Sequence, residues 1–231
     1  MNPERIQQNL AAVRDRIAAA ARRAGREPES VTLVAVTKRS PPELIRPLFE
    51  FGAIDLGENY PQELWRKSEA LGDLPVRWHL IGHLQSNKAA RTMPMVRMIH
   101  AVDSLKLLQV LDGLARDMAD PPRVCLQVNT SAEVAKHGWS PTDIQREAAA
   151  IAACVSVPIV GLMTMAAFGT TAETARPSFV MLREVRDSLS ALTGLPLPEL
   201  SMGMSNDFET AIEEGATLVR VGSALFEGVE P

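Results

Sequence analysis

Short apolar runs rich in β-branched residues recur along the chain, separated by segments whose apolar residues follow a helical spacing. This alternation is typical of parallel strands joined by crossover helices. Eight runs are expected to be strands, at residues 31–37, 53–56, 76–81, 98–102, 124–128, 159–163, 199–202 and 217–221. Eight strands are enough to close a barrel, so the pattern predicts an α/β fold of the TIM (β/α)8 barrel class.

The segments between these strands are expected to be helices, at residues 42–51, 62–71, 105–118, 143–154 and 174–192. A further segment, residues 3–24, comes before the first strand. Its apolar residues recur at i, i+4, i+7 and i+11, namely at Ile6, Leu10, Val13 and Ile17. The chain is therefore predicted to carry an extra N-terminal amphipathic helix.

Length and charge limit the classes of protein that the chain can represent. The 231 residues fit one globular domain, residues 1–231, of barrel size. The 24 Lys and Arg residues face 28 Asp and Glu residues, and the net charge of -4 gives no broad attraction for nucleic acid or an anionic membrane. No stretch reaches the roughly 18 apolar residues of a membrane span. We expect a cytoplasmic protein, with Cys125 and Cys154 as buried thiols outside any C-x-x-C motif.

Lys38 is the first candidate for chemistry. It closes the apolar run of residues 31–37 and is followed by the chain-breaking pair Pro41 and Pro42. In a barrel, binding and chemistry collect where the parallel strands end, and an amine there can react with a carbonyl ligand. The alternative is a solvated surface lysine.

Small and polar residues that could hold an anion follow the seventh expected strand. Residues 201–205 read Ser-Met-Gly-Met-Ser, and Asn206 and Glu209 after them have the spacing of a helix capping box. Such a helix start exposes backbone amides, Gly203 permits a close approach, and Ser205 adds a hydroxyl. An anion site is therefore expected here, although ordinary capping also explains the residues.

The eighth expected strand ends with Arg220, Gly222 and Ser223, which offer a cation, an unobstructed backbone and a hydroxyl. A phosphate site between strands seven and eight is a recurrent arrangement in barrels. A structural ion pair is the alternative role for Arg220.

Several ordered motifs resemble the pyridoxal phosphate homeostasis protein family, which in turn resembles the barrel domain of alanine racemase. The motifs run nearly end to end, as Val-Thr-Lys at 36–38, Gly-Glu-Asn-Tyr at 57–60, His-Leu-Ile-Gly-His-Leu-Gln-Ser-Asn-Lys at 79–88, Ser-Met-Gly-Met-Ser at 201–205 and Val-Arg-Val-Gly-Ser at 219–223. The resemblance implies a Schiff base between Lys38 and pyridoxal 5'-phosphate (PLP), with Asn59 beside the cofactor and Arg220 facing the pyridine nitrogen. It also implies phosphate contacts from Met204, Ser205, Gly222 and Ser223.

Arg220 in that position has a chemical consequence. A guanidinium only donates hydrogen bonds, so the ring nitrogen must accept one. An unprotonated pyridine is a weaker electron sink than a protonated one and stabilises a substrate carbanion less well. Alanine racemase uses an arginine at the matching place, so racemisation is not excluded on this ground.

A racemase also needs a second acid–base group on the other face of the substrate. In alanine racemase a second domain supplies a tyrosine for this role, whereas the single tyrosine of this chain is Tyr60. His79 and His83, near the end of the third expected strand, could face the ligand or could only shape the loop through hydrogen bonds. His100 is expected to be a satisfied interior histidine.

Two further positions have open roles. Lys88 could receive the aldehyde as a second amine or steer the phosphate inward. His137 is expected to be exposed, and members of the resembling family often carry serine in its place.

The interpretation favoured by the resemblance is a monomeric barrel that binds PLP reversibly and acts as a buffer or carrier to apo-enzymes. It is expected to lack robust catalysis. A small fold-type III PLP-dependent amino-acid racemase is the main alternative. A phosphate-binding barrel unrelated to vitamin B6, in which Lys38 only neutralises an anion, is a third possibility.

Overall fold

Eight parallel strands form one closed barrel in sequence order, and the last strand pairs with the first. The computed structural model describes residues 3–131, 137–167, 169 and 171–229. The strands are β1 (Thr32–Val36), β2 (Asp55–Glu58), β3 (Arg77–Leu80), β4 (Met98–Val102), β5 (Arg123–Gln127), β6 (Ile159–Met163), β7 (Glu199–Met204) and β8 (Leu218–Val221). The predicted TIM (β/α)8 barrel is confirmed.

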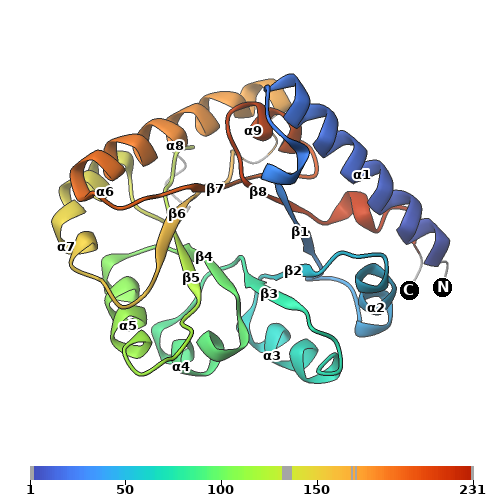
Figure 1. Ribbon diagram of the computed structural model, residues 1–231, viewed down its shortest axis with the longest axis horizontal. Helices are drawn as coiled ribbons and strands as arrows, with labels where there is room; N and C mark the ends of the chain where they lie inside the picture. The colour runs from blue at the N-terminus through green and yellow to red at the C-terminus, as the bar shows by residue number, and fades with distance from the viewer. Residues whose placement is uncertain (1–2, 132–136, 168, 170, 230–231) are drawn as a thin grey trace.

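Helices surround the strands (Figure 1). They are α1 (Pro3–Arg23), α2 (Pro42–Glu50), α3 (Pro61–Ala70), α4 (Ala89–Thr92), α5 (Leu105–Ala115), α6 (Pro141–Arg146), α7 (Ala148–Ala152), α8 (Ala172–Thr193) and α9 (Phe208–Glu213). Four short 3-10 helices complete the described part of the chain, η1 (Pro28–Ser30), η2 (Ser86–Lys88), η3 (Met93–Met95) and η4 (Ser223–Leu225).

The strands bury apolar side chains on both faces, as expected for a parallel sheet covered by helices. The larger cluster lies between the strands and the helices, and includes Leu56, Leu80 and Leu126. A smaller cluster fills the inside of the barrel, with the members Val34, Val36, Ile81, Met98, Ala101, Cys125, Met163 and Leu218. Alternate residues therefore face inward in most strands, with a register shift in β4, and this parity decides which polar side chains can meet inside the barrel.

β2 lies further along the chain than expected, at Asp55–Glu58 instead of residues 53–56. Gly57 pairs with Val36 and His79 in the neighbouring strands. A Cβ at Gly57 would lie 3.0 Å from Val34 Cγ1, so glycine allows the barrel wall to close here. A Gly-Glu pair is not apolar, which is why the hydrophobic pattern ended the strand too early.

The expected helix at residues 143–154 is divided into α6 and α7. The break is at Glu147, whose backbone (φ -91, ψ 6) leaves the α-helical region. Its carboxylate accepts a hydrogen bond from Trp139 Nε1 at 2.7 Å. A side-chain contact from outside the segment thus accompanies the interruption.

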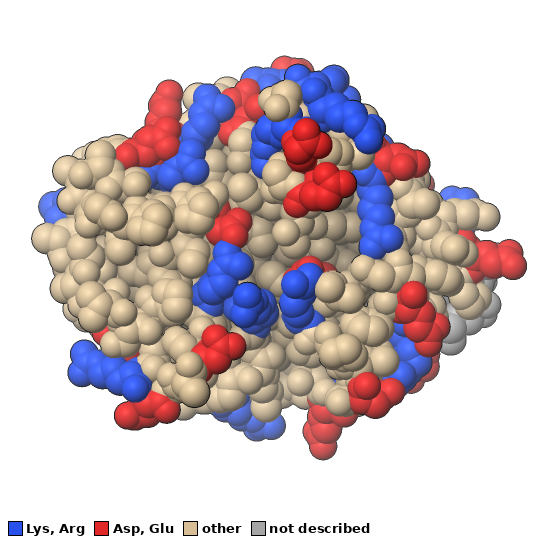
Figure 2. Space-filling view, viewed as in Figure 1, with Lys and Arg blue, Asp and Glu red and all other residues tan. Residues whose placement is uncertain are grey.

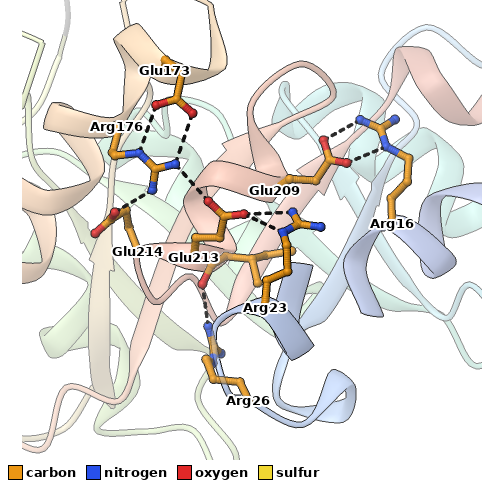
Figure 3. Close-up of polar contacts among 9 residues, drawn as sticks. Arg16, Arg23, Arg26, Glu173, Arg176, Glu209, Glu213 and Glu214 are labelled. Carbon is orange, nitrogen blue, oxygen red and sulfur yellow. Dashed lines mark hydrogen bonds and ion pairs between the residues drawn. The ribbon is translucent and has the colours of Figure 1, made fainter. Parts of the chain in front are cut away.

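The predicted N-terminal helix is confirmed as α1, which lies alongside α9 (Figure 1). Its apolar stripe of Ile6, Leu10, Val13 and Ile17 is buried. On its polar side, arginines reach acidic residues of α9 (Figure 3). Arg16 Nη2 lies 2.8 Å from Glu209 Oε2, and Arg23 Nη2 lies 2.9 Å from Glu213 Oε1.

The same charged network continues into α8 (Figure 3). Arg176 pairs with Glu173 of its own helix and with Glu213 and Glu214 at the end of α9, at 3.2, 2.9 and 2.8 Å. An exposed pair typically contributes only about 0–1 kcal/mol. The network therefore orients α1, α8 and α9 around β7 and β8, while apolar burial provides most of the stability.

Basic and acidic side chains are interspersed over the face shown in Figure 2, with a small basic group near its centre and acidic side chains beside it. This face therefore has no broad patch of one charge. Among the described residues, no helix combines the length and the apolar character needed to cross a bilayer.

Candidate functional site

Lys38 lies in an exposed turn two residues beyond the end of β1. Val34 and Val36 face the inside of the barrel, and Lys38 is the exposed residue two positions after Val36. Thr37 has the opposite parity and is buried, and its Oγ1 donates to Glu58 Oε1 at 2.5 Å. An accessible amine therefore stands at the carboxyl end of the barrel, where sites of this fold are found.

The loops after β7 and β8 meet beside the end of β1. The backbone N–H of Gly222 donates to Ser205 Oγ at 3.3 Å. A Cβ at Gly222 would lie 3.2 Å from both the Cβ and the carbonyl oxygen of Val36, a distance tighter than an ordinary contact. Ser223 follows at the exposed start of η4. Two hydroxyls and a backbone without a side chain therefore converge at one part of the rim.

The capping box expected from Asn206 and Glu209 was wrong. α9 begins at Phe208, its N-cap is Asp207, and Asn206 is exposed. Glu209 is bound instead by Arg16, whose Nη2 and Nε donate to its carboxylate at 2.8 and 3.0 Å. The Glu209 carboxylate is thus engaged by α1 and does not reach back to an N-cap amide.

Asp207 folds back onto β7 rather than capping α9. Its Oδ1 accepts a hydrogen bond from the Met204 backbone amide at 2.5 Å. The tight path depends on Gly203, which has φ 93 and would place a Cβ only 2.6 Å from Ala211 Cβ. Burial raises the pKa of Asp207, against the opposing effect of this hydrogen bond and of Arg220. An anion could accept from the Met204 amide only by displacing this carboxylate.

Arg220 is only 3% exposed and points into the barrel below this rim. Its Nη1 donates to Ser201 Oγ at 2.7 Å, and its Nη2 donates to the carbonyl oxygen of Thr164 at 2.9 Å. Burial lowers the pKa of Arg220 to about 10, although Asp207 and Cys125 oppose the shift. The guanidinium therefore remains charged near neutral pH and is held by Ser201 of β7 and by Thr164, which follows β6.

A chain of hydrogen bonds runs from Ser201 across the inside of the barrel. Ser201 Oγ lies 2.7 Å from His100 Nδ1, and His100 Nε2 lies 2.8 Å from His79 Nδ1. His79 Nε2 then lies 2.9 Å from Asp55 Oδ1. The other oxygen of Asp55 pairs with Arg77 at 2.7 Å. The predicted satisfied interior role of His100 is thus confirmed, while His79 lies inside the barrel and does not shape the loop after β3.

One assignment of protons satisfies every bond of this chain. Asp55 Oδ1 accepts from His79 Nε2–H, which leaves His79 Nδ1 to accept from His100 Nε2–H. His100 Nδ1 then accepts from the Ser201 hydroxyl, whose oxygen accepts from Arg220. Burial, followed by the nearby His79 and Arg220, lowers the pKa of His100 well below its usual value and keeps the ring neutral. All donors therefore point from the guanidinium toward the carboxylate.

A second buried polar group holds the ends of β1 and β2. Lys67 of α3 and Glu58 of β2 are fully buried, with 2.7 Å between Nζ and Oε1. Lys67 also donates to the carbonyl oxygen of Thr37 at 2.7 Å. Asn59 follows β2 at the rim and is half-buried, and a Cβ at Gly82 would lie 2.2 Å from its carbonyl oxygen. The neighbouring ends of β1, β2 and β3 are thereby held together.

Sequence analysis assigned no role to four residues of these buried polar groups, namely Asp55, Ser201, Thr164 and Lys67. The available signal was the inward parity of the strands, which places Asp55, His79, Ser201 and Arg220 on one face of the barrel wall. Tyr60 precedes α3 and is 64% exposed, and Lys88 ends η2 and is half-buried. His137 is exposed, as expected.

The fold is a closed barrel with its candidate site at the carboxyl ends of the strands, as in the N-terminal domain of alanine racemase. The model of the family "Alanine racemase, N-terminal domain" matches residues 8–230. Over 223 residues, covering 96% of this chain and 94% of the relative, the chain is 43% identical to a pyridoxal phosphate homeostasis protein of Pseudomonas aeruginosa. The chain belongs to the pyridoxal phosphate homeostasis protein family.

Solved structures agree with this assignment. PipY of Synechococcus elongatus PCC7942 with PLP bound is 38% identical, with a TM-score of 0.84 over 96% of this chain and 99% of that one. Alanine racemase of Corynebacterium glutamicum is 17% identical, with a TM-score of 0.73 over 99% of this chain and 63% of that one. The latter similarity shows the fold alone.

Proposed function

We propose that this protein binds PLP reversibly in the cytoplasm, as a Schiff base on Lys38, and acts as a buffer and carrier that supplies PLP to apo-enzymes. The observation that carries the proposal is the meeting of three strand ends at one rim. An exposed amine follows β1, and the linked loops of Ser205 and Gly222 follow β7 and β8. Arg220 lies between and below them.

The chemistry of each group suits the parts of the cofactor. The Lys38 amine condenses with the aldehyde and releases water, and hydrolysis or transfer to another amine reverses the bond. Asn59 lies beside the ring, and Arg220 donates to the pyridine nitrogen. The phosphate is held by backbone and side-chain donors of Met204, Ser205, Gly222 and Ser223. For the Met204 amide to contribute, the phosphate must take the place of the Asp207 carboxylate.

The proposed role as a buffer rests on the site and on the relatives. A ring nitrogen that accepts from a charged guanidinium remains unprotonated, which weakens the cofactor as an electron sink. The relatives are named as homeostasis proteins, and one solved relative contains PLP. We propose that the chain works as a single PLP-binding barrel domain, residues 1–231, and as a monomer.

The covalent linkage can be tested by mixing the purified protein with PLP and following the imine absorption band. Borohydride reduction and peptide mass spectrometry should then locate the adduct at Lys38. Lys38→Ala should remove the band and retain some phosphate-dependent affinity. Lys106→Ala is a matched control that removes another exposed amine. An adduct on another lysine, or an unchanged band in Lys38→Ala, would overturn the assignment.

The carrier role needs a separate measurement. The PLP-loaded protein should restore activity to an apo-enzyme that requires PLP, and borohydride-reduced protein should not. Placing the two proteins on opposite sides of a dialysis membrane distinguishes release through solution from transfer by contact. Failure of the loaded protein to restore activity under either condition would contradict the carrier role without affecting the Lys38 linkage.

A further inference from the structure

A group of side chains that could bind a metal ion lies at the same end of the barrel as the proposed PLP site, after β3, β4 and β5. His83 follows β3, Asp103 directly follows β4, and His137 lies after β5. One ligand atom from each residue lies within 4.8 Å of the other two. The imidazoles are 46% and 68% exposed, while the carboxylate is only 8% exposed. A fixed carboxylate thus lies below two accessible rings.

The distances within this group are close to those of a transition-metal site. Asp103 Oδ2 lies 2.7 Å from His83 Nδ1 and 3.8 Å from His137 Nδ1. Tetrahedral zinc with bonds of about 2.0–2.1 Å to nitrogen and oxygen places its ligand atoms about 3.3 Å apart. The two observed separations lie on either side of this value. All three ligand atoms lie within 4.8 Å of one another, so side-chain rotations must draw the more widely separated atoms together for all three to bind one ion.

The stacking of the two rings supports a ligand role. The His83 and His137 rings are nearly parallel, with an interplanar angle of 19° and centroids 4.8 Å apart. In this arrangement both Nδ1 atoms lie on the same side as one carboxylate oxygen, Asp103 Oδ2, at 2.7 and 3.8 Å. His83 Nδ1 is close enough to share a proton with Asp103, whereas 3.8 Å is too long for a hydrogen bond to His137. A metal ion can replace that shared proton and bind all three atoms.

A solvent-open cleft next to the group gives an ion access. Its walls include His83, Ser86, Asp103 and Ser104. Two imidazoles and one carboxylate are a donor set that suits zinc and neighbouring divalent transition metals better than calcium or magnesium, which prefer oxygen ligands. Water from the cleft can complete the coordination, which leaves the site open.

We propose that His83, Asp103 and His137 bind one divalent transition-metal ion of the zinc type and thereby connect the loops that follow β3, β4 and β5. None of these residues belongs to the proposed PLP site, so the two proposals can fail independently. The chain contains four histidines, and the other two, His79 and His100, are buried inside the barrel. Both free cysteines are also buried. Among the described residues, these three therefore form the one group of three or more His, Cys, Asp or Glu side chains close enough to hold a metal ion.

The test uses tag-free protein treated with a chelator and then titrated with Co2+ and Zn2+. We expect one ion per chain, visible absorption from Co2+ with nitrogen and oxygen ligands, and proton release measured by calorimetry in buffers of different ionisation enthalpy. His137→Ser should weaken Zn2+ binding by more than the roughly 10- to 100-fold that the loss of a supporting outer group causes. His83→Gln and Asp103→Asn should act similarly, and the PLP imine band should be unchanged in His137→Ser.

Asp117→Asn is the matched control, because it removes an exposed carboxylate after α5 that belongs to no such ligand group among the described residues. It should bind Zn2+ like the unmodified protein. Absence of stoichiometric binding by the unmodified protein would overturn the proposal, as would equal affinity in His137→Ser. An intense near-ultraviolet Co2+–thiolate band would assign the ion to a cysteine instead and would also overturn it.

Discussion

His79 and His100 share one hydrogen bond inside the barrel, with 2.8 Å between His79 Nδ1 and His100 Nε2. The rings are tilted by 52° and both residues are buried. Because Asp55 holds the proton of His79 at Nε2, the shared proton belongs to His100. His100 Nδ1 must therefore accept from Ser201. The tautomer of His79 thus sets the tautomer of His100. This in turn fixes the direction of the Ser201 hydroxyl, whose oxygen accepts the hydrogen bond from Arg220.

Ser201→Ala should disturb both ends of this arrangement. His100 Nδ1 loses its donor and Arg220 Nη1 loses its acceptor, while the shape of the residue changes little. A buried polar group left without a partner costs about 1–3 kcal/mol, so the free energy of unfolding in urea should decrease by this amount. PLP affinity should decrease as well, because Arg220 is less well oriented.

The control is Ser178→Ala, which removes a buried hydroxyl from α8 outside the barrel interior. It should leave PLP affinity unchanged. Equal PLP affinity in Ser201→Ala and the unmodified protein would show that Ser201 does not orient the guanidinium.

The lowered pKa of His100 predicts a loss of stability in acid. Above the unfolded-state pKa of about 6.5, neither state binds the extra proton, so His100 adds no pH dependence. As pH falls through this value, the unfolded chain takes up a proton that the folded chain excludes. The free energy of unfolding should then decrease by at most about 1.4 kcal/mol per pH unit for this one proton.

His100→Gln tests the assignment of this effect. The variant should be less stable than the unmodified protein at pH 7, because Ser201 loses its acceptor. Its stability should nevertheless change less between pH 7 and pH 5, since the titrating group is gone. Urea unfolding at several pH values measures both quantities, and an identical pH dependence in the two proteins would refute the role of His100.

The barrel could be predicted because its signals are local. Strand and helix periodicities are visible within short windows, and the buried stripe of α1 was likewise read from Ile6 to Ile17. Strand ends were predicted less well where the last residues are not apolar. At β2, Gly57 and Glu58 extend the strand for reasons that lie in the neighbouring strands and in α3.

The polar interior could not be predicted from local patterns. His100 and Ser201 are 101 positions apart and meet only because the barrel closes. The capping-box prediction also failed because of a long-range contact, since Glu209 binds Arg16, which lies 193 positions away in the sequence. Sequence motifs predicted the candidate site residues. The partners that orient Arg220, such as Ser201 and His100, become apparent only when the strands are placed in register.

Lys67→Met should destabilise the protein strongly. The substitution leaves the Glu58 carboxylate buried without its cation, and breaking a buried pair in this way costs about 3–5 kcal/mol. Glu58 Oε2 already has no hydrogen-bond partner in the described part of the chain. The double variant Lys67→Met with Glu58→Gln should recover part of the loss, because no unpaired charge remains. Urea unfolding compares them, and a single variant as stable as the double would contradict this explanation.

Gly222→Ala should weaken PLP binding. The new Cβ would lie 3.2 Å from Val36 Cβ and from its carbonyl oxygen, so the loop that carries Ser223 must move away from β1. Gly113→Ala in α5 is the matched control, because its Cβ would meet no atom within 4 Å. That control should gain up to about 1 kcal/mol of stability from helix propensity. Unchanged PLP affinity in Gly222→Ala, measured by titration of the imine band, would remove Gly222 from the proposed phosphate site.

The PLP-loaded protein should not racemise amino acids appreciably faster than free PLP. Racemisation needs a proton donor and a proton acceptor on opposite faces of the substrate carbon. Lys38 can serve one face, but the hydroxyl of Tyr60 belongs to a side chain that is 64% exposed before α3, and His79 and His100 are engaged inside the barrel. Chiral chromatography of a panel of L-amino acids incubated with the protein measures the rate. Inversion that exceeds free PLP and disappears in Lys38→Ala would establish the racemase alternative, and loss of that activity in Tyr60→Phe would identify the second group.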